Sequence, residues 1–380
     1  MMARDIRFTW AFVCALGASG VGGPALAGDL RSSPEIAGCD YMFTGPVEEG
    51  DAQRIEETIP ARYDGSRLCL DSPGGNFVEG LRMFHAIWNK DSVVTYVRSG
   101  DACYSACAIA FLGGSHVMGT GAIRFRKAVI EPGAHLGFHA PRLVLEEGSD
   151  HTSKEVEDAY AWALKGASYL FDLTQIVEHG TRGMTSFLFS RTLATPPEDM
   201  YEIDTIGKAS LSQVDVAHVP LPKITWGAMR NVCDTGYVMV SDRFSGLDSA
   251  EKAFGTFTDQ GFDGSGNPIS LEDRVWSWTT GNFSYFAIRG YHAAHVNEKF
   301  CMVSMSHYAW DRENALPLEQ KDPSSAFQVT FWNAAHVPID RSFAGYVENN
   351  TRADHVVSVP WFALWDPNTP LTKFAAGADN

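Results

Sequence analysis

Short apolar runs alternate with longer amphipathic stretches along the first half of the chain, from about residue 36 to residue 222. Apolar runs bounded by Gly, Asp or Pro are typical of buried strands, and apolar positions spaced three and four residues apart are typical of helices. The predicted strands are 41–43, 68–70 and 93–97, and the predicted helices are 51–59, 78–88, 106–112 and 154–178. Because strands that alternate with helices need crossover connections, this half is expected to be an α/β domain with a mostly parallel sheet.

The pattern changes after Pro220 and Pro222. Seven of the ten tryptophans follow this point, and short aromatic and β-branched runs, such as 236–241 and 327–332, are separated by Gly, Pro, Asp and Asn. Such runs predict strands joined by turns. The sequence therefore predicts two domains, an α/β domain over 28–222 and a smaller, mainly β domain over 223–380.

The first residues have the three-part pattern of a secretory signal peptide, predicted over 1–27. Arg4 and Arg7 precede an apolar stretch over 8–21, and an Ala-Leu-Ala triplet ending at Ala27 supplies the small residues that a signal peptidase requires. We therefore expect cleavage after this triplet and export to the periplasm or the exterior.

Cysteine usage agrees with export. Six of the seven cysteines follow the predicted signal peptide, and an even number in an exported chain predicts disulfides, with 15 possible pairings. Domain membership favours Cys233 with Cys301, the two in the C-terminal part. The other four are then expected to pair among themselves: Cys39, Cys69, Cys103 and Cys107. A zinc site is not expected, because the sequence has no Cys-x-x-Cys pair.

Composition and charge exclude several classes of protein. Apolar residues make up 45% and charged residues 20% of the chain, which excludes a disordered or collagen-like protein. With 30 basic and 46 acidic residues the net charge is −16, and no compact Lys/Arg block occurs, so nucleic acid is not an expected partner. No apolar run reaches the roughly 18 residues of a spanning helix, so no membrane span is expected.

Two segments of the first half offer groups for acyl transfer. The pair Gly74-Gly75 follows a predicted strand, and glycines there let backbone N–H groups approach a ligand, although a simple tight turn has the same pattern. Ser105 precedes the apolar helix 106–112, whose N-terminus can stabilise an oxyanion or a nucleophilic oxygen. Serine is also a favoured N-cap, so a purely structural role for this residue stays open.

A third segment offers a base. His139 ends an apolar run just before Pro141, where its ring can face the end of a neighbouring strand. A lone histidine in this position is commonly a hydrogen-bonded core residue. Within reach of Ser105 it becomes a general base, because imidazole accepts a hydroxyl proton at neutral pH.

The order of these segments resembles the Clp protease proteolytic-subunit family, within the wider crotonase-like superfamily. The features that carry the resemblance are Ser-Pro-Gly-Gly at 72–75 after a strand, then a serine at a helix start, then the His-x-Pro turn at 139–141. It spans roughly residues 40–220 and is closest to an exported bacterial branch with Cys-x-Ser-x-Cys around the serine.

The resemblance implies a mostly parallel sheet with crossover helices and a set of site residues. By analogy, Ser105 attacks a carbonyl and His139 accepts the hydroxyl proton. The backbone N–H groups of Gly75 and Ala106 would hold the oxyanion, with Gly74 as the supporting turn. Rings are typical of the family, so a homo-oligomer is a further expectation by analogy.

A third member should orient the histidine and stabilise the imidazolium. The family places an aspartate shortly before an aromatic residue near the last elements of the sheet, and Asp199, followed by Tyr201, fits this best. Glu198 and Asp204 are close alternatives, and an exposed surface carboxylate is the alternative without function.

The chain departs from the family pattern in three respects. The stretch 120–131 lengthens the spacing between serine and histidine, and nothing in the family corresponds to the chain from about 223 onward. Cys103 and Cys107 flank Ser105, and a disulfide involving either would lock the serine's turn or twist it out of reach. An ATP-driven unfoldase is not an expected partner, because ATP is not available outside the cytoplasm.

Neither a metal nor a cofactor is expected. Residues 263–267 begin like a calcium loop, but Pro268 stands at the glycine position and Arg274 at the position of the bidentate Glu. His292 and His295 have no further ligand nearby in sequence.

Together these features predict an exported serine hydrolase, a peptidase that acts on a peptide or protein substrate through an acyl-enzyme on Ser105. One alternative is a binding or scaffold protein that keeps the fold without catalysis. Another is acyl-thioester chemistry of the crotonase kind, which uses the same oxyanion hole but needs no serine–histidine pair.

Overall fold

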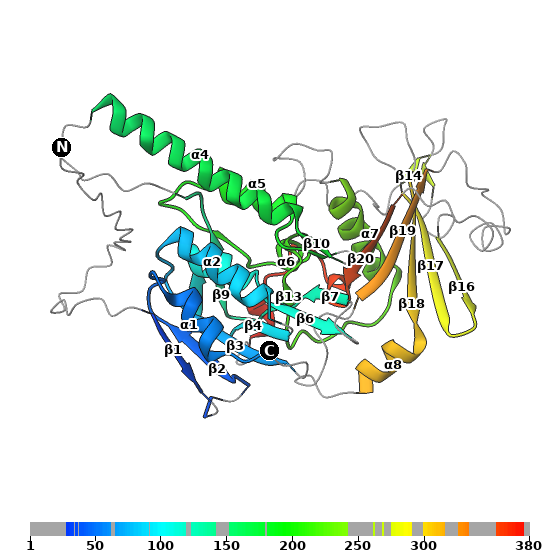
Figure 1. The fold of residues 1–380 in the computed structure, drawn as a ribbon. Helices are drawn as coiled ribbons and strands as arrows, with labels where there is room; N and C mark the ends of the chain where they lie inside the picture. Colours follow the sequence, from blue (N-terminus) through cyan, green and yellow to red (C-terminus); the bar gives the residue numbers. More distant parts are fainter. Residues whose placement is uncertain are drawn as a thin grey trace, which may run out of the picture. The chain divides into compact units, whose positions relative to one another are not determined.

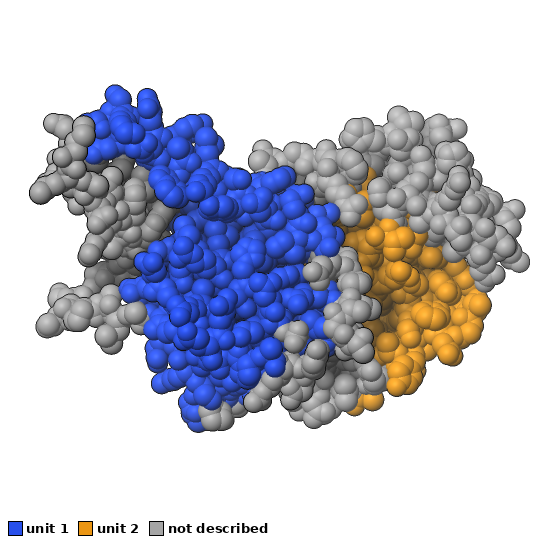
Figure 2. Space-filling view, viewed as in Figure 1, with its two compact units in different colours: residues 1–203 blue, residues 204–380 orange. Residues whose placement is uncertain are grey.

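The computed structural model describes residues 28–33, 35–36, 38–61, 65–90, 92–118, 123–141, 152–178, 181–241, 261–262, 268–269, 275–290, 299–315, 326–333 and 355–375. They belong to two compact units, residues 1–203 and residues 204–380, which Figure 2 colours separately. The first unit mixes helices and strands and the second is mainly β, so the predicted α/β class with a mainly β C-terminal part is confirmed at this level. The predicted signal peptide, 1–27, lies outside the described residues.

The main sheet of the first unit has a parallel centre with antiparallel additions. The central strands, β2 (Tyr41–Thr44), β3 (Ser66–Asp71) and β4 (Ser92–Val97), are parallel and coincide with the three predicted strands. β8 (Ala128–Ile130) pairs parallel with β4. The antiparallel members are β1 (Asp29–Ser32), β6 (Ser115–Met118) and β7 (Ile123–Arg126), and the sheet order is β1-β2-β3-β4-β6-β7.

Two of the helices cross between parallel strands, as the alternating pattern predicted. α1 (Asp51–Thr58) connects β2 to β3, and α2 (Phe77–Trp88) connects β3 to β4. The predicted helices 51–59 and 78–88 are thus confirmed. Their apolar faces pack into the core, where Ile55 and Phe84 are completely buried. The side chain of Asn76 caps α2 by accepting a hydrogen bond from the backbone N–H of Glu79 at 3.1 Å.

A second, smaller sheet carries the segments with the candidate chemistry. Its order is β12-β9-β5, with β5 (Ala102–Tyr104) parallel and β12 (Tyr201–Glu202) antiparallel to the middle strand β9 (His135–Phe138). β5 runs directly into α3 (Ala106–Phe111), a helix whose six residues are all buried. Between β9 and β12 the chain forms α4 (Ser153–Gln175), the short hairpin β10 (Val177–Glu178) and β11 (Thr181–Arg182), and α5 (Ser186–Ala194) (Figure 1).

The second unit is an antiparallel sheet with a helix packed on one face. Its strands follow chain order: β16 (Val275–Thr280), β17 (Phe283–Gly290), β18 (Lys299–Ser306), β19 (Ala326–Asn333) and β20 (His355–Pro360). Val303 and Val329 lie opposite each other on β18 and β19 and share one core with Val232 of α7 (Trp226–Ser241). The remaining described elements are α6 (Ile206–Ser212), β13 (Asp215–Val216), β14 (Gly261–Phe262), β15 (Pro268–Ile269), α8 (His307–Ala315), η5 (Trp361–Leu364) and η6 (Leu371–Phe374).

One predicted strand is wrong. The run 236–241 was assigned to a strand for its β-branched and aromatic residues, but it is the last part of helix α7. Over the longer window, Met229, Val232, Cys233 and Val240 recur at helical spacing, and all four are buried. Burial against the sheet therefore outweighs the local strand preference of the run. The other predicted strand of this half, 327–332, is confirmed as β19.

The chain divides into its two units after Ile203, earlier than the boundary predicted after 222. The segment after this point is tied to the C-terminal end of the chain. The N–H of Ile206 donates to the carbonyl of Thr369 at 3.0 Å, and the N–H of Leu371 donates to the carbonyl of Asp204 at 2.8 Å. These backbone bonds bring the α6 segment into the second unit.

The six cysteines of the described residues form three disulfides: Cys39–Cys69, Cys103–Cys107 and Cys233–Cys301. The predicted pairing of Cys233 with Cys301 is confirmed, and it joins α7 to β18. Disulfides suit an oxidising compartment outside the cytoplasm. No helix among the described residues combines the length and the apolar character that a membrane crossing requires.

The contact between α2 and α3 leaves no room for a side chain at Gly80. A Cβ atom on this residue would lie 2.5 Å from the carbonyl oxygen of Ala106. We predict that Gly80→Ala lowers the free energy of unfolding by about 1–3 kcal/mol, because the two helices must move apart. Urea denaturation followed by circular dichroism measures the change.

Gly166→Ala in α4 is the matched control for this prediction. A Cβ atom there would meet its nearest neighbour, a Phe77 ring carbon, at 3.5 Å, an ordinary van der Waals distance. Alanine favours helix over glycine by about 1 kcal/mol, so this variant should be neutral or more stable. Equal destabilisation by both substitutions would contradict the close contact at Gly80.

Candidate active site

Ser105 has a backbone conformation that is unusual for a residue with a side chain. The residue lies between β5 and α3 with φ 56° and ψ −119°, a conformation that costs a non-glycine residue about 1–3 kcal/mol. Among the described residues of this unit, no other non-glycine residue has a positive φ. Its N–H donates to the carbonyl of Gly137 at 3.0 Å, and its carbonyl accepts from the N–H of Ile109 at 3.1 Å. Both backbone polar groups are therefore fixed while the turn between them is strained.

The hydroxyl of Ser105 does not cap the helix that follows. Ser105 occupies the N-cap position of α3, yet its side chain makes no capping hydrogen bond. By contrast, the N-cap side chains of Asn76, Thr185 and Thr205 each accept a hydrogen bond from the N–H three residues on. Ser105 therefore does not have the N-cap role that the sequence left open. Its half-buried side chain is available for other contacts.

The glycine pair lies directly against this serine. Gly74 and Gly75 have φ angles of 92° and 149°, which residues with a side chain rarely adopt. A Cβ atom on Gly74 would lie 2.8 Å from Cβ of Ser105 and 3.2 Å from the backbone nitrogen of Ala106. The carbonyl of Gly74 accepts from the N–H of Val47 at 2.8 Å, which fixes the turn. The structure therefore brings together the glycine pair, the serine and the start of α3.

Two backbone N–H groups at this place have no acceptor within the described part of the chain. They belong to Gly75 and Ala106, the two residues that the family resemblance implies for an oxyanion hole. Ala106 is the first residue of α3, where helix geometry leaves the N–H without a partner inside the helix. Such N–H groups can bind a negatively charged oxygen.

His139 follows the strand that pairs with the serine's strand. Tyr104 lies opposite Gly137 in the parallel pair of β5 and β9, so Ser105 and His139 come just after the carboxyl ends of neighbouring strands. His139 is 8% exposed, and its Nδ1 lies 2.8 Å from the carbonyl oxygen of Ala140. This contact needs the proton on Nδ1, which leaves Nε2 in the form that accepts protons. No hydrogen bond joins Ser105 Oγ to the His139 ring within the described residues.

Asp199, the predicted third member, is exposed. It belongs to a segment that contacts the residue after His139. The N–H of Ala140 donates to the carbonyl of Thr195 at 3.0 Å, which brings this segment beside the residue after His139. The carboxylate of Asp199 makes no hydrogen bond to the described residues. Glu198 is also exposed, and Asp204 pairs with Lys208 of α6, so no contact of the described residues supports Asp199 or either alternative as the third member.

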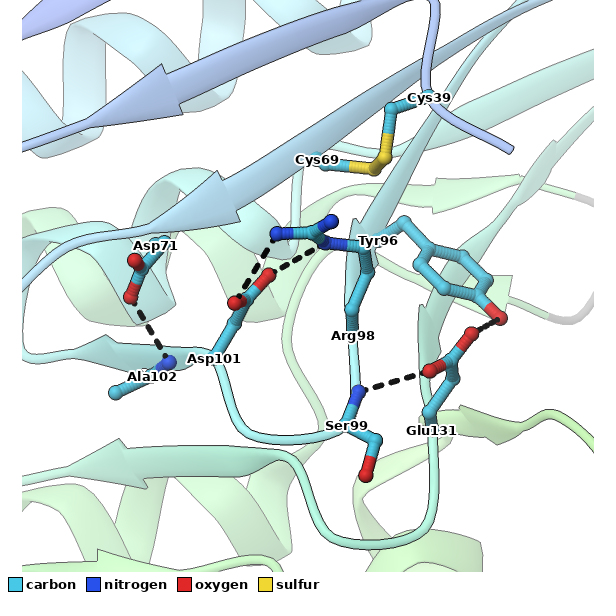
Figure 3. A network of polar contacts seen from close by, with 9 residues as sticks. All are labelled: Cys39, Cys69, Asp71, Tyr96, Arg98, Ser99, Asp101, Ala102 and Glu131. Atoms are coloured by element: carbon cyan, nitrogen blue, oxygen red, sulfur yellow. Dashed lines mark hydrogen bonds and ion pairs between the residues drawn. A yellow bond between two sulfur atoms is a disulfide. The ribbon is translucent and has the colours of Figure 1, made fainter. Parts of the chain in front are cut away.

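A polar network fixes the loop that leads into the serine's strand (Figure 3). The loop 98–101 connects β4 to β5, and within it the Arg98 guanidinium donates two hydrogen bonds to the carboxylate of Asp101, at 2.7 and 3.2 Å. Glu131 accepts from the hydroxyl of Tyr96 and from the N–H of Ser99, both at 2.8 Å. The loop is thus held at both ends before β5 begins.

The network brings carboxylates close together at the carboxyl ends of the parallel strands. The carboxylate of Asp71, the last residue of β3, accepts from the N–H of Ala102 at 3.1 Å. Burial raises the pKa of Asp101, the hydrogen bond from Arg98 opposes this, and the charges of Asp71 and Glu131 add to the rise. Burial also raises the pKa of Tyr96, and its hydrogen bond to Glu131 raises it further.

The second unit contains a serine–histidine pair that no sequence motif predicts. Ser284 Oγ on β17 lies 2.6 Å from Nε2 of His307, the first residue of α8. Nothing in the spacing of these residues, 23 positions apart, signals the contact. Ser284 lies inside a regular strand rather than at a strained turn, and no glycine pair precedes it. Strand pairing alone explains its position.

The described residues contain no group of three or more His, Cys, Asp or Glu side chains arranged to hold a metal ion. The calcium-like segment 263–267 and the pair His292 and His295 lie outside the described residues. A comparison of the chain with protein-family models gives no match, and a comparison with curated protein sequences gives none either.

The raised pKa of Asp101 gives a testable pH dependence of stability. Between the ordinary aspartate pKa of 3.8 and the raised native value, the folded state binds more protons than the unfolded state, so this residue's contribution to stability falls as pH rises. We predict that the free energy of unfolding of wild type minus that of Asp101→Asn falls from acid to neutral pH. Urea denaturation at a series of pH values tests this.

A difference that grows with pH would contradict this prediction. It would mean that the ion pair with Arg98 outweighs burial and holds the pKa of Asp101 below the ordinary value.

Proposed function

We propose that this chain is a serine hydrolase, a peptidase that forms an acyl-enzyme on Ser105. The observation that carries the proposal is the backbone of Ser105 itself. A non-glycine residue with positive φ at a sharp strand-to-helix turn presents its side chain outward, as nucleophilic serines on such turns do. Since the hydroxyl does not cap α3, helix capping does not account for the strained backbone.

The proposed reaction uses the hydroxyl of Ser105, the imidazole of His139 and two backbone N–H groups. His139 takes the proton from Ser105 Oγ as this oxygen attacks the substrate carbonyl, and the N–H groups of Gly75 and Ala106 hold the oxyanion. The tetrahedral intermediate collapses to the acyl-enzyme as His139 gives its proton to the leaving amine. Water then attacks the ester with the same histidine as base, which releases the acid and restores the hydroxyl.

The carbonyl of Ala140 supports His139 as the base in this proposal. It orients the ring and holds the proton on Nδ1, which is the first task of the third member of a triad. The described residues show no hydrogen bond between Ser105 and His139, and this does not weigh against the proposal, because catalytic contacts often shorten only when substrate binds.

The proposal extends to fold and setting. We propose a Clp protease-like or crotonase-like fold for 28–222, for which the parallel strands β2, β3 and β4 with crossover helices α1 and α2 give support. The same proposal includes a periplasmic or secreted location, a peptide or protein substrate, independence from an ATP-driven unfoldase, and self-association. The three disulfides support an exported protein.

A non-catalytic binding or scaffold role is the second candidate. The observation that favours it is the absence, within the described residues, of a hydrogen bond between Ser105 Oγ and His139. In a scaffold, the strained turn would be a remnant of an inherited active site.

A fluorophosphonate probe, which reacts with activated serines, separates the two candidates. We predict that the folded, oxidised protein is labelled, that Ser105→Ala abolishes labelling, and that Ser284→Ala leaves the rate unchanged. The second variant is the matched control, because Ser284 has a histidine contact at 2.6 Å but no strained turn. Mass spectrometry of the labelled peptide identifies the site.

The opposite outcomes of the probe experiment are equally clear. If the folded wild-type protein is not labelled, the scaffold role replaces the hydrolase. If the label is found on Ser284, the nucleophile is in the second unit and the site proposed on Ser105 is wrong.

Variants of His139 and Asp199 test which groups activate the serine. We predict that His139→Ala slows labelling by about 10²–10⁴-fold, because the general base is lost, while the melting temperature shifts by only a few degrees. Asp199→Asn should keep the rate within about threefold, since its carboxylate is exposed and makes no contact with the histidine.

Comparing the labelling rates of these two variants decides the role of the carboxylate. A loss of rate in Asp199→Asn as large as in His139→Ala would show that Asp199 is the third member after all. Normal labelling of His139→Ala would exclude this histidine as the base.

A further inference from the structure

The disulfide between Cys103 and Cys107 encloses Ser105. One cysteine belongs to β5 and the other to the first turn of α3, so the bond bridges the strand-to-helix turn with the serine at its centre. The two Cα atoms are 5.2 Å apart, and both residues are completely buried. The bond therefore holds the two arms of the strained turn together inside the core.

The short loop of this disulfide points to a role in the native state. A disulfide stabilises a fold partly by restricting the unfolded chain, and this effect grows with the number of residues enclosed. The sequence separation is 4 here, against 30 for Cys39–Cys69 and 68 for Cys233–Cys301. By this measure Cys103–Cys107 contributes least to global stability of the three, although it spans the strained residue Ser105.

A strained residue keeps its conformation only when its surroundings prevent relaxation. Backbone hydrogen bonds fix the N–H of Ser105 to Gly137 and its carbonyl to Ile109, and Gly74 packs against its Cβ. A return of φ to negative values would move the chain on either side of Ser105. The disulfide opposes that movement, because it ties the residues two positions before and two positions after the serine.

We propose that the Cys103–Cys107 disulfide is the positioning element of the nucleophile: it holds Ser105 at positive φ, next to the Ala106 N–H, and so sets the reactivity of the hydroxyl rather than the stability of the fold. The inference rests on the proposed hydrolase function, and it assigns a distinct role to the Cys-x-Ser-x-Cys pattern. Cys103 and Cys107 act through Ser105 and do not contact substrate.

The test compares two double variants that each remove one buried disulfide of the same unit. Cys103→Ala with Cys107→Ala removes the proposed positioning bond, and Cys39→Ala with Cys69→Ala is the matched control. For each protein, the second-order rate constant of fluorophosphonate labelling and the melting temperature are measured. We expect the first variant to lose about 10- to 100-fold in labelling rate with a small shift in melting temperature. The control should lose more in melting temperature but keep its labelling rate within about threefold.

Two outcomes of this comparison would overturn the proposal. One is a Cys103→Ala, Cys107→Ala protein that is labelled at the wild-type rate. The other is a loss of labelling in both double variants that follows their loss of melting temperature, because the bond would then act only through general stability.

Amide hydrogen exchange provides a readout that needs no catalysis. We expect the N–H groups of Ser105 and Ile109, which bond to Gly137 and Ser105, to lose protection in the Cys103→Ala, Cys107→Ala protein and to keep it in the control. If the wild type is not labelled but this exchange pattern appears, the proposed function fails and the positioning role stands. Unchanged protection in both variants would contradict the positioning role whatever the labelling shows.

Discussion

Ser105 holds a positive φ because its N–H, its carbonyl and its neighbours on both sides are all fixed by the fold. The strain is about 1–3 kcal/mol, a considerable part of the 5–15 kcal/mol that a typical domain has in total. It persists because β5 is paired with β9, α3 is buried, and the loop before β5 is held by Arg98 and Glu131. The parallel sheet and its buried helix thus serve to keep one turn in a conformation that a free peptide would leave.

Much of the first unit could be predicted because its pattern of burial is simple. Strands buried on both faces are continuous apolar runs, and the crossover helices show one apolar face, so β2, β3 and β4 with α1 and α2 follow from the sequence. Parallel pairing then places the ends of neighbouring strands at one edge, which is why Ser105 and His139 could be expected near each other. The conformation of Ser105 could not be predicted, because it depends on contacts of Gly74 and Gly137 that are distant in sequence.

In the second unit, a short sequence window predicts a strand where the structure has a helix. The run 236–241 has strand-forming residues, but the whole of 226–241 is a helix that buries one side against a five-stranded sheet. A window of six residues cannot distinguish these cases, since the helical spacing of Met229, Val232 and Val240 appears only over a longer stretch. The Ser284–His307 contact could not be predicted from the sequence for a related reason. It depends on the register between β17 and the chain after β18, which no motif encodes.

The hydrogen bond from His139 Nδ1 to the carbonyl of Ala140 matters for the chemistry proposed at Ser105. A carbonyl holds the tautomer of the ring as a carboxylate does, but it carries no full charge to stabilise the imidazolium that forms when the proton is transferred. In the proposed hydrolase this contact orients the ring, and the charge on the substrate oxygen is stabilised on the oxyanion side. The donors proposed on that side are the N–H groups of Gly75 and Ala106, and the turn at Gly74 lies directly against Ser105 and the Ala106 nitrogen. The positions of these two proposed donors relative to the serine depend on the same turn that strains it, so the strained residue and both N–H groups form one structural unit.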